Sequence, residues 1–383
     1  MDHPFLNEQH QLIRESVRDF AEREIKPRAK ELDEKQEFSI ELTRKMGEIG
    51  LFGMVVSPEY GGQGLDYLSY IIAIEEIARV DGSHAATVAA GNSLGMNPIY
   101  YYGSEEHKKK YLPRLCTGEA LFGFGLTEPQ AGSDSRGTKT NAKLEDGQWN
   151  INGSKIFITN ASSEITLGSI VQVITGTNTN GEKIYSVIIV ENGTPGFTAK
   201  TMHDKMMWRA SNTAELYFDD CKVPEANLLG EIGKGSKMML ETLDNGRLAI
   251  GAMGLGLAQG AFEMALQYAK ERVQFGKPIS KQQIIGFKLA DMAMKIELAR
   301  NLLYKACWLK DNNKPFAMEA AMSKLYCSEV AQEVANEAVQ IHGGYGLMKD
   351  YDIERFFRDQ RLLQIGEGTS EIQRLVISRY LGC

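Results

Sequence analysis

Hydrophobic and polar positions follow a helical spacing through the first part of the chain. In the segment 5–33, apolar residues such as Val17 and Phe20 recur three or four positions apart against a densely charged face, which predicts an amphipathic helix. Residues 68–80 are almost wholly apolar apart from two glutamates and one arginine, so they predict a buried helix. We therefore expect an N-terminal α-helical domain over residues 1–120.

The spacing becomes an alternating one over residues 121–230. Short apolar runs are separated here by turn-forming pairs, and this pattern predicts β-strands. Asn152-Gly153 and Asn180-Gly181 are dipeptides that favour tight hairpin turns, and a further turn is expected at Asp219-Asp220. The segment therefore predicts an antiparallel β domain.

Helical spacing returns after residue 230. Seven small or apolar residues are spaced alternately four and three positions apart, as in a seam between packed helices: Ile285, Leu289, Met292, Ile296, Ala299, Leu303 and Ala306. Residues 231–383 are therefore expected to form a helical bundle. The three segments together predict a multi-domain α+β fold.

Composition and charge exclude several classes of protein. Of the 383 residues, 43% are hydrophobic and 24% are charged, as in an ordinary soluble protein. The net charge is −7 and no Lys/Arg-rich tract is present, so a nucleic-acid binder is disfavoured. Purely apolar runs are far shorter than a bilayer requires, so we expect no membrane span. Glycine is unusually frequent, at 38 residues, and its positions need an explanation.

The cysteines and the N-terminus indicate the compartment. The five cysteines are scattered and form no CxxC pair, and the six histidines form no HExxH motif. This pattern is typical of free thiols in a reducing compartment, and it predicts no metal site. The N-terminus has no basic segment followed by an apolar one, so no secretory signal is expected. We therefore expect a cytoplasmic protein.

Glu367 is the most conspicuous candidate for chemistry, because it stands between Gly366 and Gly368. Glycines on both sides let the backbone approach a ligand closely. A carboxylate that is partly desolvated gains basicity, so Glu367 could act as a general base. It could instead be a loop residue that caps the helix expected to begin near Ile372.

Other segments are ambiguous by themselves. Residues 125–134 are rich in small and hydroxyl-bearing side chains, so their backbone N–H groups could hold a cofactor or a phosphate, but a plain turn explains them equally well. Segments 272–277 and 340–346 both end helices, where basic side chains and glycine are favoured without any ligand. Arg247 could pair with Asp244 or face a ligand.

The order and spacing of these motifs together resemble the acyl-CoA dehydrogenase family over essentially the whole chain. The matching stretches are Leu126-Thr127-Glu128-Pro129 with Ala131-Gly132-Ser133-Asp134, Asn152-Gly153-Ser154-Lys155 with Ile158-Thr159-Asn160, Arg272 to Lys277, Gln340 to Gly344, Arg358-Asp359 and Glu367-Gly368-Thr369. The resemblance implies an N-terminal helical domain, a middle β domain and a C-terminal four-helix bundle. It also implies bound FAD and a homotetramer.

The resemblance assigns roles to individual residues. Glu367 would be the catalytic base. The residues that would bind FAD are Phe124, Leu126, Thr127, Gly132, Ser133, Phe157, Ile158, Thr159, Arg272, Gln274, Phe275, Gln283, Gln340, Ile341, His342, Gly343, Gly344, Thr369 and Glu371. Of these, the segment from Arg272 to Gln283 and the loop from Gln340 to Gly344 would serve the FAD of a neighbouring subunit. The acyl-CoA would contact Ser133, Asp244, Arg247, Gly366 and Gly368.

The implied reaction is FAD-dependent α,β-dehydrogenation of an acyl-CoA thioester to the 2-enoyl-CoA, a step of β-oxidation. Glu367 would remove the α-proton while a hydride passes from the β-carbon to flavin N5. An electron-transferring flavoprotein would then accept the electrons. An acyl-CoA oxidase is a weaker alternative, because such relatives usually carry an additional C-terminal domain. A non-catalytic CoA- or flavin-binding scaffold ought to lack Glu367.

Gly366 bears on the acyl group. Many family members have tyrosine before the catalytic glutamate, and glycine there leaves more space beside the base. Gly246 stands where some relatives that accept branched chains carry the base, so Glu367 keeps that role. We therefore expect a branched or alicyclic substrate, such as cyclohexanecarboxyl-CoA. A straight short- or medium-chain acyl-CoA of the butyryl type is the alternative.

Overall fold

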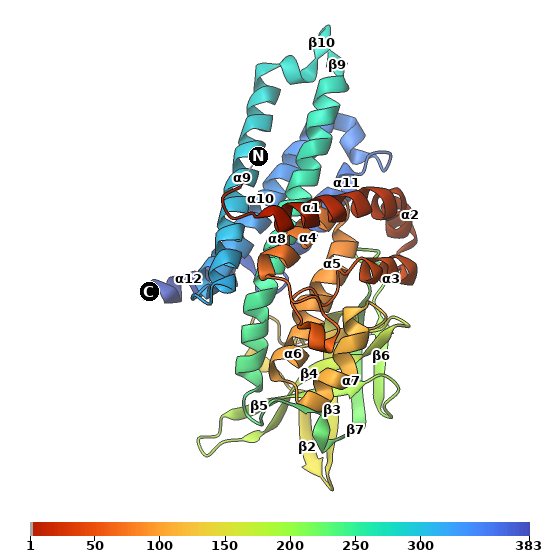
Figure 1. The fold of residues 1–383 in the computed structure, drawn as a ribbon, viewed down its shortest axis with the longest axis vertical. Helices are drawn as coiled ribbons and strands as arrows, with labels where there is room; N and C mark the ends of the chain where they lie inside the picture. The colour runs from red at the N-terminus through yellow and green to blue at the C-terminus, as the bar shows by residue number, and fades with distance from the viewer. Residues whose placement is uncertain (1–2) are drawn as a thin grey trace.

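The computed structural model describes residues 3–383 as a helical N-terminal part, a β-sheet and a set of long C-terminal helices. Figure 1 shows the sheet at one end of the molecule and one long helix, residues 235–271, running from it to the opposite end, with the other long helices along its far half and the N-terminal helices beside it. The predicted order of helical, β and helical segments is confirmed.

The N-terminal part is built from seven α-helices. They are α1 (Glu8–Phe20), α2 (Lys26–Lys35), α3 (Ile40–Glu48), α4 (Tyr67–Ala78), α5 (Gly82–Ala90), α6 (Asn97–Tyr102) and α7 (Glu105–Cys116), with π-helical turns at Ala21–Ile25 and Gly91–Met96 and a 3₁₀ turn at Pro58–Tyr60. The predicted buried helix is α4, in which every residue is buried. Its N-cap is Asp66, whose Oδ1 accepts a hydrogen bond of 2.8 Å from the N–H of Ser69.

The middle part is an eight-stranded sheet. Its strands are β1 (Leu121–Gly125), β2 (Asn141–Glu145), β3 (Gln148–Thr159), β4 (Thr166–Thr177), β5 (Lys183–Glu191), β6 (Phe197–Thr201), β7 (Thr213–Pro224) and β8 (Leu228–Leu229), with 3₁₀ turns at Ser135–Gly137 and Glu225–Asn227. The order is β6-β7-β3-β2-β4-β5-β8, and β1 pairs with β4. Most neighbours are antiparallel as predicted, but β1 and β2 both pair in parallel with β4.

Two of the three predicted turns in the sheet are wrong. Strand β3 continues through Asn152-Gly153, and β7 continues through Asp219-Asp220, where the facing register shifts. The hairpin between β2 and β3 turns instead at Asp146-Gly147, where both residues have positive φ, 50° and 72°. The predicted turn at Asn180-Gly181 is confirmed, because it lies between β4 and β5.

The C-terminal part contains five α-helices. They are α8 (Gly235–Glu271), α9 (Gln283–Asp311), α10 (Ala317–His342), α11 (Ile353–Asp359) and α12 (Ser370–Tyr380), with two short strands, β9 (Val273–Gln274) and β10 (Lys277–Pro278), and 3₁₀ turns at Ile279–Lys281, Gly343–Leu347 and Gln360–Gln364. Six of the seven predicted seam residues of α9 are buried, and Ile285 is partly buried. Helix α8 is long and apolar enough to cross a membrane, but 78% of its most apolar window is buried within the fold.

One hydrophobic core joins the two helical parts. It includes Ile25 and Leu255 and reaches the sheet through Phe122 and Val187, whereas a second core lies within the sheet. The expected boundaries near residues 120 and 230 fall in the connections from α7 to β1 and from β8 to α8. We propose that these connections are the domain boundaries. The two helical domains form a single packing unit.

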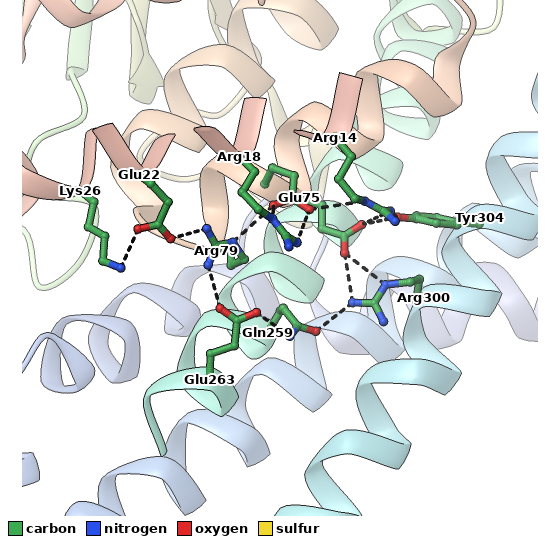
Figure 2. A network of polar contacts seen from close by, with 11 residues as sticks. Arg14, Arg18, Glu22, Lys26, Glu75, Arg79, Gln259, Glu263, Arg300 and Tyr304 are labelled. Atoms are coloured by element: carbon green, nitrogen blue, oxygen red, sulfur yellow. Dashed lines mark hydrogen bonds and ion pairs between the residues drawn. The ribbon is translucent and has the colours of Figure 1, made fainter. Parts of the chain in front are cut away.

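A buried network of ion pairs fastens α1 to α4, α8 and α9 (Figure 2). Glu76 of α4 accepts a hydrogen bond of 2.8 Å from Arg18 of α1. Arg79 reaches Glu263 of α8 at 2.7 Å, and Arg300 of α9 reaches Glu75 at 3.1 Å. Glu75 and Glu76 are buried as well as paired, so their charges are compensated inside the fold.

Candidate active site

Glu367 lies in the short loop between the 3₁₀ turn Gln360–Gln364 and α12. Its φ is 52° and that of Gly368 is 90°, so both residues adopt the left-handed conformation, which is unfavourable for a residue with a β-carbon. Thr369, not Glu367, caps α12, because its Oγ1 accepts a hydrogen bond from the N–H of Ile372 at 3.3 Å. The interpretation of Glu367 as the helix cap is therefore wrong.

The carboxylate of Glu367 packs against the backbone of α8. A β-carbon built on Gly246 would lie 1.9 Å from Glu367 Oε2, so glycine is the residue that leaves room for the carboxylate. Although the residue as a whole is only half-buried, Oε2 is buried and has no hydrogen-bond partner among residues 3–383. Burial raises the pKa of Glu367 to about 7, against the opposing effects of Lys324 and Arg247. Such a carboxylate is poised to accept a proton.

Asp244 and Arg247 lie within one turn of Gly246 on α8 and form an ion pair with each other. The Arg247 side chain is buried, and its Nε has no partner within the described part of the chain. Tyr67 of α4 donates a hydrogen bond of 2.9 Å to the carbonyl of Asn245. The predicted substrate residues Asp244 and Arg247 are thus brought to the same stretch of α8 as the base.

The loop after β1, residues 126–140, is held by a buried ion pair that the sequence analysis missed. Lys155 of β3 lies 2.7 Å from Glu128, and both side chains are almost completely buried. Glu128 also accepts hydrogen bonds from the N–H groups of Lys139 and Thr140, at 2.7 and 3.1 Å. The loop therefore folds around Glu128. The predicted residues Gly132 and Ser133 lie exposed at its outer edge.

Phe157 of β3 has a positive φ of 62°, and its side chain is 63% exposed. The N–H of the preceding residue, Ile156, donates to the carbonyl of Thr127 at 3.0 Å, which brings the predicted residues Leu126 and Thr127 beside Phe157 and Thr159. Unlike Phe157, the predicted residues Phe124 and Ile158 have buried side chains. The Ile158 side chain packs in the core of the sheet, so only the backbone of Ile158 is available to a ligand.

A second group of predicted residues lines one cavity of about 500 Å³ at the far end of the long helices. Its lining includes Arg272, Gln274, Ile341, His342, Gly343 and Gly344. A β-carbon on either glycine would have no atom within 4 Å, so the backbone there is open to a ligand. Phe275 is 95% exposed. Gln283 and Gln340 are exposed but are not part of the lining.

His342 is a packed histidine. Its Nδ1 lies 2.8 Å from the carbonyl of Ala338, and its ring stacks on Tyr268 with 4.4 Å between ring centroids. Burial lowers its pKa, so it lines the cavity as a neutral ring.

The two groups of predicted residues lie far apart within one chain. Gly246 and Arg272 are separated by 26 positions of a continuous helix, which at 1.5 Å per residue is roughly 39 Å. Figure 1 shows the same separation, with β9 and β10 at the opposite end of α8 from the sheet. Thr369 and Glu371 follow Glu367 closely in the chain, so they belong with the predicted residues near the base and not with those that line the distant cavity. Glu371 is exposed.

Sequence reasoning also missed Lys324 and Gln373, which contact the loop that carries Glu367. Lys324 Nζ donates to the carbonyl of Gly368 at 2.6 Å, and Gln373 Nε2 donates to the same carbonyl at 2.9 Å. A signal for Lys324 exists, because it shares a helix face with the small residues Ala320, Cys327 and Ser328. A lysine on such a face is almost never fully buried unless it has a partner.

Three family models match the chain in succession. They are the N-terminal domain of acyl-CoA dehydrogenase over residues 7–119, the middle domain over residues 123–221 and the C-terminal domain over residues 233–382. Together they account for most of the chain.

Individual relatives agree with these models. A probable acyl-CoA dehydrogenase of Bacillus subtilis is 52% identical over 98% of both chains. The structure of butyryl-CoA dehydrogenase from Megasphaera elsdenii is 44% identical, with a TM-score of 0.95 and complete coverage of both chains. An acyl-CoA dehydrogenase of Bacillus anthracis, solved in complex with FAD, is 38% identical with a TM-score of 0.92, covering 98% of this chain and 67% of that one. The chain therefore belongs to the acyl-CoA dehydrogenase family and is an FAD-dependent oxidoreductase.

Proposed function

We propose that the chain dehydrogenates a short, straight-chain acyl-CoA to the trans-2-enoyl-CoA, with Glu367 as the base that removes the α-proton. The observation that carries this proposal is the carboxylate of Glu367, which has a buried oxygen without a partner within residues 3–383 and faces a glycine on α8. The 44% identical butyryl-CoA dehydrogenase supports a short straight acyl chain.

Proton removal from a thioester is difficult because the α-proton is far less acidic than an ordinary carboxylic acid. Burial raises the pKa of Glu367 to about 7, which makes its carboxylate a stronger base than one in water. A hydrogen bond from the backbone N–H of Glu367 to the thioester oxygen would stabilise the negative charge that develops there. Arg247 and Asp244 would hold the CoA moiety close to the base.

The residues around Phe157 fit a flavin ring, and the distant cavity fits the adenosine and diphosphate of FAD. The exposed aromatic ring of Phe157 stands beside the hydroxyl-bearing residues Thr127 and Thr159. In the cavity, two open glycines and the cationic Arg272 suit a diphosphate. When bound, FAD supplies the acceptor for the hydride that leaves the β-carbon.

A second copy of the chain is needed to complete each FAD site in this proposal. The roughly 39 Å along α8 between the two groups is longer than an extended dinucleotide, so one FAD cannot contact both groups of the same chain. Helix α9 also presents a stripe of exposed apolar side chains, formed by Ile284, Phe287, Met294 and Leu298. Such a stripe is typical of a surface that packs against another copy. We infer a homo-oligomer, with the homotetramer of the family as its expected form.

The surroundings of Gly366 bear on the acyl group. A β-carbon on Gly366 would lie 3.3 Å from Cδ2 of Leu362, so Leu362 already fills the space on that side of the backbone. This contact weakens the argument that glycine opens room for a bulky acyl group. The branched or alicyclic substrate stays the second candidate, and its one support is that Gly366 has no side chain.

Anaerobic bleaching of the purified yellow holoenzyme tests the proposal. The thioesters are butyryl-, hexanoyl-, isobutyryl- and cyclohexanecarboxyl-CoA, and the rate is followed at the visible flavin band. We expect the highest rate with butyryl- or hexanoyl-CoA, and faster reoxidation by an electron-transferring flavoprotein than by air. A clear preference for the branched or cyclic thioesters would establish the second candidate instead. Bleaching by none of them would refute both candidate substrates.

A further inference from the structure

Lys324 of α10 is a lysine buried without a carboxylate partner. Its exposed fraction is 0%, and among residues 3–383 no aspartate or glutamate lies within ion-pair distance of its Nζ. Instead, Nζ donates to the backbone carbonyl of Gly368 at 2.6 Å. Burying an ammonium group is costly when no charge compensates it, so this placement calls for a functional reason.

The contact fixes the backbone that carries the base. Besides Lys324, Gln373 of α12 donates to the carbonyl of Gly368 at 2.9 Å and to that of Glu367 at 3.3 Å. These bonds hold Glu367 and Gly368 in their left-handed conformations. With the backbone turned in this way, the side chain of Glu367 reaches Gly246 on α8.

The positive charge of Lys324 also acts on Glu367, because it opposes the rise that burial causes in the pKa of this carboxylate. Helix α8 contributes Arg247, but Asp244 neutralises that cation through an ion pair. Helix α4 contributes the phenols of Tyr67 and Tyr70, which burial keeps neutral by raising their pKa values. Helix α12 contributes the exposed Glu371, which interacts weakly with Lys324. Of the two cations near Glu367, Arg247 is paired with Asp244, whereas Lys324 forms no ion pair within the described chain.

We propose that Lys324 is a positioning residue for the dehydrogenation, which clamps the carbonyl of Gly368 and favours the ionised form of Glu367. The inference rests on the proposed role of Glu367 as the base. Burial lowers the pKa of Lys324 to about 8, so the ammonium form still predominates at pH 7. The clamp thus places the base over Gly246 and counteracts the tendency of burial to neutralise it.

Three variants separate the clamp from the charge. Lys324→Met removes both the donor and the charge, Lys324→Gln keeps a donor without the charge, and Gln373→Leu removes a donor to the same carbonyl without changing any charge. The measurement is kcat/KM with butyryl-CoA between pH 5.5 and 9, on holoenzyme whose FAD content is determined.

We expect the acid limb of the profile to move upward by about one pH unit in both Lys324 variants. This shift corresponds to a loss of about tenfold in the acid limb, with partial recovery at high pH. Gln373→Leu should lower the plateau and leave the acid limb where it is in the unmodified enzyme. Should Lys324→Met fail to fold, Lys324→Gln carries the test, because its amide keeps a polar hydrogen-bond donor at this buried position.

A readout without turnover reports the same ionisation. The unfolding midpoint is measured as a function of pH for the unmodified protein and for each Lys324 variant, with and without the additional change Glu367→Gln. The difference in midpoint between the proteins with and without Glu367→Gln isolates the titration of Glu367. We expect that titration to move upward in the Lys324→Gln background. An unmoved acid limb and an unmoved titration in the Lys324 variants would overturn the inference. Full turnover by Glu367→Gln alone would instead refute the proposed base, whatever Lys324 does.

Discussion

A β-carbon at Gly246 would lie 1.9 Å from Oε2 of Glu367, so the backbone of α8 and the carboxylate of the loop before α12 share one narrow space. Gly246→Ala would normally favour a helix by up to about 1 kcal/mol. Here the added methyl group must displace the carboxylate. We expect kcat to fall by about 100-fold, while FAD content and the unfolding temperature stay close to those of the unmodified enzyme. An unchanged kcat would show that the base acts from another position.

The pH dependence of stability should carry a signature of Glu367. Its pKa is raised from the ordinary value of 4.5 to about 7 in the folded chain, so the folded state binds the proton more tightly than the unfolded state. The resulting stability is fully present below pH 4.5 and is lost as pH rises through 7. Glu367→Gln abolishes this loss, and we expect it to raise the free energy of unfolding at pH 8 by up to about 3 kcal/mol.

Denaturant unfolding at pH 4.5 and pH 8 measures this effect. The Glu367→Gln variant should differ from the unmodified protein mainly at pH 8. Equal stability of the two proteins at both pH values would contradict the burial of an ionisable carboxylate at this site.

The ion pair between Lys155 and Glu128 should be a strong determinant of stability. Lys155→Met leaves the Glu128 carboxylate buried without its cation, so we expect a loss of about 3–5 kcal/mol in the free energy of unfolding. The loop from Leu126 to Thr140 should loosen at the same time, which hydrogen exchange of its amides would detect. Lys35→Met is the matched control: its ion pair with Glu31 is exposed and should contribute little to stability. If Lys155→Met loses no more free energy of unfolding than Lys35→Met, the ion pair between Lys155 and Glu128 does not stabilise the fold.

The open glycine at residue 344 gives a test of the distant half of the cofactor site. A β-carbon there would meet no atom within 4 Å, so Gly344→Val should leave folding intact. The same side chain would fill the proposed FAD cavity, and we expect the variant to lose FAD more readily during dialysis. Gly176→Ala is the control, because it adds a side chain at a similarly open position of β4. Equal FAD retention in both variants would place the cofactor elsewhere.

The hydrophobic pattern predicts the order of helical and β segments well, because it follows directly from which faces are buried. It fails at Asn152-Gly153, where the same dipeptide that favours a hairpin forms an irregularity inside β3. A β-carbon on Gly153 would lie 2.5 Å from Thr140 Oγ1, so this glycine serves a close approach between two segments. Local sequence does not distinguish that use of glycine from a turn.

The sequence points to Glu367 and to the motifs that accompany it, but it gives little indication of the residues that support the loop. Glu367 stands out because two glycines flank it, and the motifs that accompany it identify the family. Lys324 and Gln373 act through backbone carbonyls. The small residues around Lys324 indicate its burial, but the carbonyl that it contacts leaves no mark in the sequence. The resemblance already predicts that the cofactor residues divide between two subunits. The distance between the two groups within one chain depends on the length of α8, which appears only when the helix is seen to be continuous.

The network of ion pairs that attaches α1 also limits which substitutions homologues of this chain can carry at these positions. Glu75 and Glu76 are adjacent and buried, and between them they accept contacts from Arg14, Arg18, Arg79 and Arg300 (Figure 2). Each carboxylate contacts more than one arginine, so replacing a single arginine leaves the carboxylate partly compensated. Replacing either glutamate instead removes the shared partner of several cations at once. The two glutamates are therefore expected to vary less among homologues than any single arginine of the network.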